Sequence, residues 1–182
     1  MTASAQRLFL ALWPEAPVQR ALLEAQAQLP LARGSRPVAP GRLHLTLHFI
    51  GTVPDAAVPA LQAALDLQAE PCTLRLDRIE LWPRGLLVWR ATDPPQALLA
   101  LHVRLGAALR ALGLPVERRA FRPHVTLARE AAPGGPWPAQ PPLHWPLAAH
   151  RLVCTGAQGA YRALQVWPWA AETVGATSRT PS

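Results

Sequence analysis

Two four-residue segments of this chain pair a histidine with a threonine at the same spacing. Residues 44–47 read His-Leu-Thr-Leu, and residues 124–127 read His-Val-Thr-Leu. Each segment alternates polar and apolar side chains, which predicts a half-buried β-strand. The histidine and the threonine of one motif then share a face, about 7 Å apart at ~3.3 Å per residue. Two such strands would surround a small anion with two imidazoles and two hydroxyls, those of His44, Thr46, His124 and Thr126.

These residue types suit acid–base catalysis at phosphorus. Imidazole titrates near neutral pH, so one histidine can accept a proton from water while the other protonates the leaving oxygen. Threonine hydroxyls can hold the phosphate oxygens, and no metal is needed when the leaving group is strained, as in a five-membered cyclic phosphate. A single motif of this kind is more often structural, because threonine is common in strands. The second copy at the same spacing favours a catalytic pair.

Composition points to one globular domain with an anionic partner. The 182 residues are half hydrophobic and carry 18 basic against 11 acidic side chains, for a net charge of +7. Every basic residue is arginine, which binds phosphate bidentately, although a GC-rich codon bias also explains the missing lysine. The two cysteines, Cys72 and Cys154, are too few for a disulfide framework, and no apolar run could span a membrane. We therefore expect a cytoplasmic protein that acts as a monomer.

Hydrophobic periodicity predicts strands and helices in alternation, which favours an α+β architecture with antiparallel or mixed sheets and outer helices. The expected strands are 7–13, 43–50 (ended by Gly51), 73–82, 86–91, 121–128, 143–154 and 160–169. The expected helices are 15–29, 54–67 and 95–112. The two histidine strands occur in similar contexts, which indicates two related lobes within one domain of residues 1–172. Residues 173–182 are small and polar, as is typical of a flexible tail.

The remaining histidines give no metal site. Alternation puts His48 on the face of His44, but four strand residues separate them by about 13 Å, too far to bind one ion. We expect His48 near the mouth of the site and His102 on a helix face. His144 and His150 have no partner motif. Neither a metal nor a cofactor is predicted.

Four segments together resemble the 2H phosphoesterase superfamily, which is named for its two His-x-Thr/Ser-x motifs. The sequence is similar in particular to the bacterial and archaeal LigT-like RNA 2′,3′-cyclic phosphodiesterases, also called 2′-5′ RNA ligases. The matching segments are Arg-Leu-Phe-Leu-Ala-Leu at 7–12, Leu-His-Leu-Thr-Leu-His-Phe-Ile-Gly at 43–51, Phe-Arg-Pro-His-Val-Thr-Leu-Ala-Arg at 121–129 and Tyr-Arg-Ala-Leu at 161–164. The resemblance spans about residues 7–169.

This resemblance implies a bilobal, pseudo-twofold fold around a central cleft. It implies hydrolysis of a 2′,3′-cyclic phosphate at an RNA end to a 2′-phosphate, without metal or cofactor. His124 would activate the water and His44 would protonate the departing 3′-oxygen, while the two threonines hold the phosphate. The reverse reaction, in which the two histidines exchange roles, would join the cyclic phosphate to a 5′-hydroxyl in a 2′-5′ linkage.

Further residues could contact the substrate. Arg129 completes a His-x-Thr-x-x-Arg pattern whose arginine reaches the phosphate in close relatives. Strict alternation points Arg129 away from His124, so either the strand ends before it or this arginine is structural. Phe9, Arg42 and Arg122 are candidates for base or RNA-backbone contacts, against roles as a core aromatic or as surface charges. Two other functions stay open: a phosphodiesterase for a small cyclic nucleotide, such as an ADP-ribose cyclic phosphate, and a non-catalytic RNA-binding module.

Overall fold

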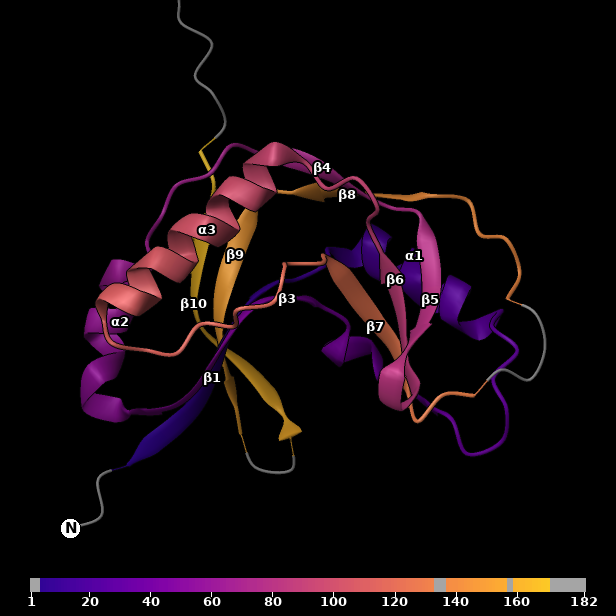
Figure 1. The fold of residues 1–182 in the computed structure, drawn as a ribbon, viewed down its shortest axis with the longest axis horizontal. Coiled ribbons are helices and arrows are strands. Elements are labelled where there is room, and N and C mark those ends of the chain that lie inside the picture. The colour runs from indigo at the N-terminus through magenta and orange to yellow at the C-terminus, as the bar shows by residue number, and fades with distance from the viewer. Residues whose placement is uncertain (1–3, 133–136, 157–158, 171–182) are drawn as a thin grey trace, which may run out of the picture.

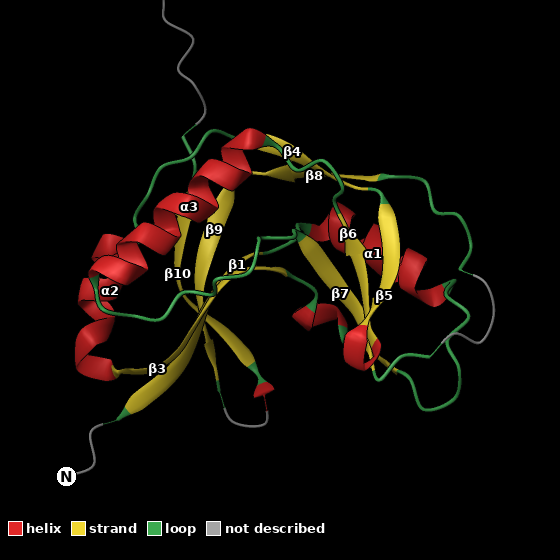
Figure 2. Cartoon of the chain, viewed as in Figure 1, coloured by secondary structure: helices red, strands yellow, loops and turns green. Residues whose placement is uncertain are grey.

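The computed structural model describes residues 4–132, 137–156 and 159–170, and the expected tail at 173–182 lies outside them. These residues form an α+β fold, as the sequence predicts (Figures 1 and 2). The helices are α1 (Ala16–Ala27), α2 (Val58–Ala64) and α3 (Gln96–Ala111), with 3-10 turns η1 (Pro40–Arg42), η2 (Asp55–Ala57) and η3 (Pro83–Gly85). The strands are β1 (Ala5–Leu12), β2 (Arg36–Pro37), β3 (Leu45–Pro54), β4 (Cys72–Leu76), β5 (Arg78–Trp82), β6 (Leu86–Arg90), β7 (His124–Arg129), β8 (Leu143–Leu147), β9 (Ala149–Thr155) and β10 (Tyr161–Pro168).

One antiparallel sheet runs through both halves of the molecule. Its order is β10-β9-β1-β3-β7-β6-β5, with β2 paired to β7, and β4 and β8 form a separate two-stranded sheet. The halves meet at β3 and β7, where Leu45 and Val125 are the paired residues. Figure 1 shows α2 and α3 beside the β1–β3–β9–β10 half and α1 beside the β5–β6–β7 half. The two histidine motifs therefore sit where the two halves join.

Helices form where apolar residues recur at helical spacing. On α3, Leu98, Leu101, Leu105 and Leu109 are fully buried, each worth about 1.5–3 kcal/mol of burial. Gly113, at φ 72°, directly follows the end of this helix in the left-handed conformation that glycine tolerates best. On α1, Val18, Leu22 and Ala25 form the buried stripe. All of these side chains join one core cluster with the apolar face of the large sheet.

Three expected strand boundaries are wrong. The strand expected at 73–82 divides at Asp77, whose side chain binds Thr92, so that β4 pairs with β8 and β5 pairs with β6. The strand expected at 143–154 divides at Ala148, because β8 pairs with β4 whereas β9 pairs with β1 and β10. Gly51 does not end β3, because the strand continues to Pro54. Gly51 has a positive φ of 89° and lies next to an irregularity in the pairing of β3 with β1, which the strand accommodates without ending.

Candidate active site

A β-bulge in each motif sets which side chains face the site. Between β1 and β3, Ala11 pairs with Thr46 and Leu10 pairs with His48, so Leu47 has no partner. A bulge inserts one extra residue and reverses the alternation after it. Thr46 therefore shares a face with Ala11, whereas His48 shares the core face with Leu10. The two motif histidines lie on the face of Thr46, immediately before the residues that join β3 to β7.

The second bulge settles the direction of Arg129. Between β6 and β7, Val88 pairs with Thr126 and Leu87 pairs with Ala128, which leaves Leu127 unpaired. Leu127 and Ala128 are both fully buried, and Arg129 returns to the face of Thr126 and is exposed. The charge of Arg129 lowers the pKa of both His44 and His124. The alternative in which the strand ends before Arg129 is wrong, because β7 includes this residue and the bulge turns it to the face of Thr126.

His48 does not lie near the mouth of the site, contrary to expectation. The same bulge places it on the core face, where it is 4% exposed. Its ring stacks on His102 with centroids 4.0 Å apart, and its Nε2 lies 2.9 Å from the His102 carbonyl oxygen. His102 in turn stacks on Phe121 at 3.9 Å. These two histidines join β3 to α3, and His102 is less exposed than a helix-face position suggests.

Both motif histidines are held in the same way. His44 Nδ1 lies 2.7 Å from the Arg42 carbonyl oxygen, and His124 Nδ1 lies 2.7 Å from the Arg122 carbonyl oxygen. A carbonyl only accepts, so each Nδ1 carries the proton and donates it. Each Nε2 is therefore the nitrogen that exchanges a proton with a ligand. Thr46 Oγ1, at 3.1 Å, lies within hydrogen-bond distance of His44 Nε2.

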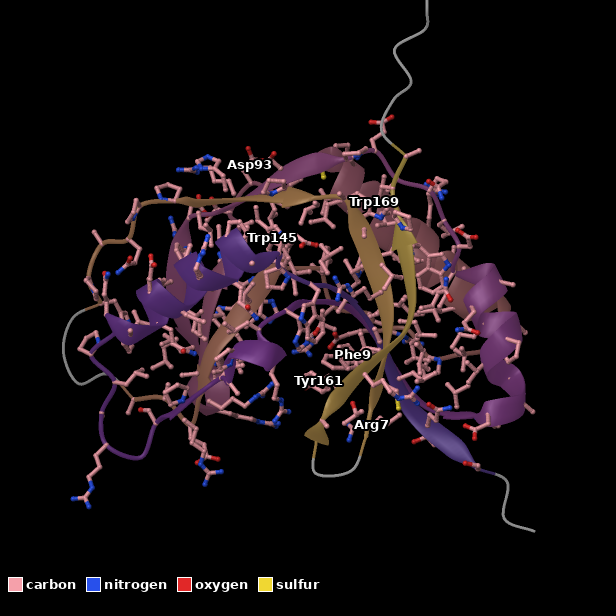
Figure 3. The ribbon with its side chains drawn as sticks, turned by 180° about the vertical axis from the view of Figure 1, so that it is seen from behind. Arg7, Phe9, Asp93, Trp145, Tyr161 and Trp169 are labelled. Atoms are coloured by element: carbon pink, nitrogen blue, oxygen red, sulfur yellow. The ribbon has the colours of Figure 1, made fainter. Side chains whose placement is uncertain are left out.

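Aromatic rings enclose His44. Trp13 stacks on its imidazole with centroids 5.1 Å apart and an interplanar angle of 7°, and Tyr161 meets it edge-on at 5.4 Å. Phe9 lies 5.2 Å from His44 and 5.0 Å from Tyr161, and Figure 3 shows Phe9 and Tyr161 side by side. The Arg42 guanidinium lies 4.7 Å from the centre of the Tyr161 ring and donates to its hydroxyl at 3.2 Å. Phe9 thus contacts His44 directly.

His124 has a matching environment in the other half. Trp82 lies half-buried with its ring centroid 4.5 Å from that of His124. The Arg122 guanidinium lies 4.5 Å from the centre of the Trp82 ring and 3.2 Å from a carboxylate oxygen of Glu80. Arg42 and Arg122, expected along an RNA path, therefore each stack on an aromatic ring beside a histidine while their carbonyls orient it.

Burial and positive charge hold both rings neutral at pH 7. Burial lowers the pKa of His44 to about 4, and the charges of Arg129, Arg42 and His124 add to this effect against the hydrogen bond to the Arg42 carbonyl. Burial also lowers the pKa of His124, with the charges of Arg122 and Arg129 in the same direction and the Arg122 carbonyl opposing. Both histidines thus start as bases, and an anion beside them would favour protonation of one.

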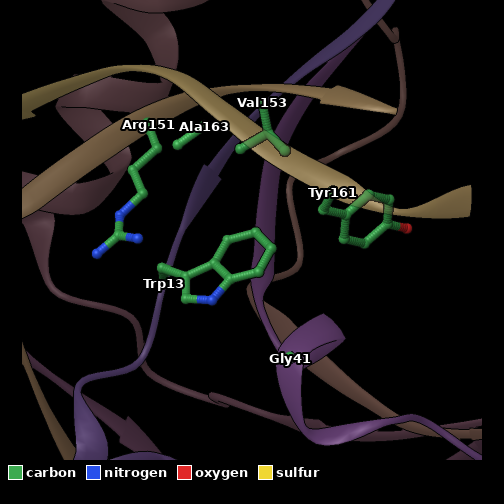
Figure 4. A pocket seen from close by; sticks show the side chains of 6 residues that line it. All are labelled: Trp13, Gly41, Arg151, Val153, Tyr161 and Ala163. Carbon is green, nitrogen blue, oxygen red and sulfur yellow. The ribbon is translucent and has the colours of Figure 1, made fainter. Parts of the chain in front are cut away.

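A cavity of about 220 Å³ lies beside Trp13 and Tyr161, two of the rings that surround His44 (Figure 4). Its lining residues are Trp13, Gly41, Arg151, Val153, Tyr161 and Ala163. Phe49, which is 65% exposed, lies 6.3 Å from Phe9 and adds an open aromatic face. Neither Trp13 nor Phe49 was predicted from the sequence as a site residue. The signal for Trp13 was its alternation with Phe9 and Ala11, which share one face of β1.

Among the described residues, no group of three or more His, Cys, Asp or Glu side chains could hold a metal ion. No helix in the described ranges is long and apolar enough to cross a membrane. Cys72 and Cys154 are both free thiols.

Known proteins resemble this chain in sequence and in fold. The family model for LigT-like phosphoesterases matches residues 12–89. An RNA 2′,3′-cyclic phosphodiesterase from Thermus thermophilus is 35% identical over 81% of this chain and 80% of its own, and one from Escherichia coli is 31% identical over 91% and 96%. The crystal structure of E. coli LigT complexed with 3′-AMP matches 91% of this chain and 99% of its own, with a TM-score of 0.80 and 27% identity. TT0787 of T. thermophilus matches 91% and 99%, with a TM-score of 0.71 and 33% identity.

These likenesses define the class of protein. The chain belongs to the LigT-like phosphoesterase family, which confirms the resemblance seen in its four sequence segments. The fold class expected from that resemblance is confirmed as well, since the structural neighbours include LigT structures and the chain forms an α+β arrangement of antiparallel sheet and helices.

Proposed function

We propose that this protein is an RNA 2′,3′-cyclic phosphodiesterase that hydrolyses a terminal cyclic phosphate to a 2′-phosphate. The relatives that share most of its length carry that name, and E. coli LigT has been crystallised with 3′-AMP and with phosphate. One observation supports the activity above all others. Two carbonyl-anchored imidazoles, His44 and His124, lie where the two halves meet, and the charge of Arg129 acts on both.

The reaction divides between the two histidines. His124 Nε2 takes a proton from the attacking water as its oxygen bonds to phosphorus, and the bond from phosphorus to the 3′-oxygen breaks. His44, protonated on Nε2, gives its proton to that oxygen, so the product carries a 2′-phosphate. The phosphate anion favours this protonated form, offsetting the burial that lowers the pKa of His44 to about 4. Arg129 holds the phosphate oxygens through paired N–H donors.

Thr46 and Thr126 support the phosphate from the two strands. Leu45 pairs with Val125 in antiparallel strands, so His44 lies opposite Thr126 and Thr46 lies opposite His124. Each histidine therefore faces the threonine of the other motif and has the threonine of its own motif two residues further along its strand. A phosphate between the strands can accept from both hydroxyls, which stabilises the charge that develops in the transition state.

The same site can also join RNA ends. A 5′-hydroxyl of RNA in place of water would attack the cyclic phosphate and form a 2′-5′ linkage, with the same two proton transfers. Because only the nucleophile differs, each histidine keeps its role and no additional residue is required; the histidines exchange roles only when a 2′-5′ linkage is cleaved back to the cyclic phosphate. The concentrations of water and of 5′-hydroxyl ends then decide which product forms.

The direct test uses a short RNA that ends in a 2′,3′-cyclic phosphate, incubated with the protein in EDTA. We expect a product heavier by one water, sensitive to phosphatase and identical in chromatography to the synthetic RNA 2′-phosphate and not to the 3′-phosphate. Variants H44A and H124A should form almost none. The matched control is H144A, because His144 is exposed on β8 and paired to Arg75 of β4, outside the large sheet. An unchanged RNA would refute the proposal, and inhibition by EDTA would refute its metal-free mechanism.

We also propose that the protein acts as a monomer in a reducing cytoplasm. The free thiols Cys72 and Cys154 support a reducing compartment, where disulfides do not form. Sedimentation at micromolar concentration tests the oligomeric state, and a stable dimer would overturn it.

A further inference from the structure

Arg129 also lines a second cavity, of about 310 Å³, where the turn η3 meets the end of β7. Its lining residues are Pro83, Arg84, Leu86, Arg129 and Glu130. Neither motif histidine lines this cavity, so it is separate from the reacting centre. Arg129 nevertheless connects the two, because the bulge at Leu127 turns it to the face of Thr126 while it also lines the cavity. The cavity therefore adjoins the place at which we propose that Arg129 holds the cyclic phosphate.

The backbone of this cavity is locally strained. Among the described residues, the non-glycine positions with positive φ are Arg84, at 64°, and Glu130, at 50°, and both line the cavity. Backbone of this kind persists where the surrounding structure fixes it, often at binding sites. Here Ala131 N–H donates to the Gly85 carbonyl at 2.9 Å, and a Cβ at Gly85 would lie 2.8 Å from Ala131 N. The two turns are thereby locked together with Arg84 at the rim.

The charges around the cavity favour an anion. Arg36 Nε binds the Glu130 carboxylate at 3.0 Å, so the one acidic lining residue is already neutralised. Arg84 and Arg129 are exposed and lie on two different segments of the wall. Guanidinium groups bind phosphate through paired N–H donors, which suits a second phosphate of the same substrate.

We infer that this cavity binds the phosphate on the 5′-oxygen of the nucleotide whose cyclic phosphate is cleaved. The inference rests on the proposed function. In an RNA strand, the 5′-oxygen is the one other position at which that nucleotide carries a phosphate. A second phosphate site beside Arg129 would therefore bind the phosphate on the 5′-oxygen. In RNA the group is an internucleotide diester, and in a free nucleotide it is a 5′-monoester. Arg84 is then a residue that selects RNA ends over nucleosides.

Three substrates test this assignment through kcat/KM. They are adenosine 2′,3′-cyclic phosphate, the same compound with a 5′-phosphate, and the dinucleotide ApA with a terminal 2′,3′-cyclic phosphate. We expect the wild type to prefer each of the last two over the first about tenfold, as for one charged hydrogen-bonded contact. R84G should bring both ratios close to one. Glycine suits the φ of 64° at this position, so the variant keeps its backbone.

The matched control is R20A, which removes the same charge. Arg20 is exposed on α1, and α1 packs on the core face of the sheet, away from the histidines. Ratios near one in the wild type, or ratios that R84G retains, would overturn the phosphate site. A preference for the dinucleotide alone would show recognition of its second nucleoside and also overturn it.

A failure of the proposed function gives a different result, because no substrate would then turn over. The phosphate site is then tested by binding. The wild type should bind adenosine 2′,5′-bisphosphate about tenfold more tightly than adenosine 2′-phosphate, and R84G should not. Equal affinities in the wild type would count against the site whatever the outcome of catalysis.

Discussion

Raising the pH from 7 to 9 should lower kcat/KM for RNA ending in a cyclic phosphate about 100-fold, because the active free enzyme needs one protonated histidine. Burial and the charge of Arg129 depress the pKa of both His44 and His124. With a pKa of about 4, His44 is protonated in roughly one molecule in a thousand at pH 7. Each further pH unit reduces that fraction tenfold.

The direction follows from the two depressed pKa values together. The ordinary pKa of histidine is 6.5, and both folded-state values lie below it. Above pH 6.5 the form with one neutral and one charged ring therefore declines with a slope of −1, whichever histidine serves as the acid. The plateau of the bell-shaped profile lies between the two pKa values, on the acid side of neutrality. The bound phosphate favours the imidazolium, so the alkaline limb of kcat should lie at higher pH than that of kcat/KM.

The assay measures initial rates at constant ionic strength from pH 5 to 9, since salt changes RNA binding. H144A serves as the control, because it removes an exposed histidine outside the site and should keep the slope. Thermal unfolding at pH 9 confirms that the protein stays folded. A level or rising kcat/KM between pH 7 and 9 would refute the division of work between a neutral and a charged histidine.

Three more predictions follow from the same geometry. H44A and H124A should each lower kcat by about 10²–10⁴-fold at unchanged thermal stability, and a loss of only a few-fold would exclude acid–base roles. R129A should lower kcat about 10²–10³-fold, and R129K should recover part of the lost activity, because lysine keeps the charge but not the bidentate hydrogen bonding of arginine. Equal activities of R129A and R129K would contradict this role of the Arg129 charge. Burial lowers the pKa of His48, and it lowers the pKa of His102 to about 4. As the pH falls below 6.5, these two histidines therefore take up protons in the unfolded chain before they do so in the folded protein. The free energy of unfolding should then fall as the pH drops from 6.5 towards 4. His102→Phe, which keeps a ring between His48 and Phe121, should reduce the loss of thermal stability over that range; an undiminished loss would assign it to other groups.

The aromatic shell around the histidines was only partly predictable. Phe9 was a candidate from its place in the first strand, and it lies 5.2 Å from His44. Trp82, the last residue of β5, was not predicted as a site residue, yet its ring centroid lies 4.5 Å from that of His124. Tyr161 comes from the last strand of the described chain, over a hundred residues from the histidine it contacts. Such contacts depend on strand order, which local pattern does not specify.

The sequence by itself determined the local elements and the chemistry they carry. Alternation identified the two motif strands, leucine spacing identified α3, and the repeated His-x-Thr pattern identified the family and predicts the reactive groups. The tertiary structure decided which way two key side chains point. Bulges at Leu47 and Leu127 turn His48 into the core and Arg129 into the site. A bulge depends on how a strand pairs with its neighbour, so its position is set by partners distant in sequence and not by the alternation of the strand itself.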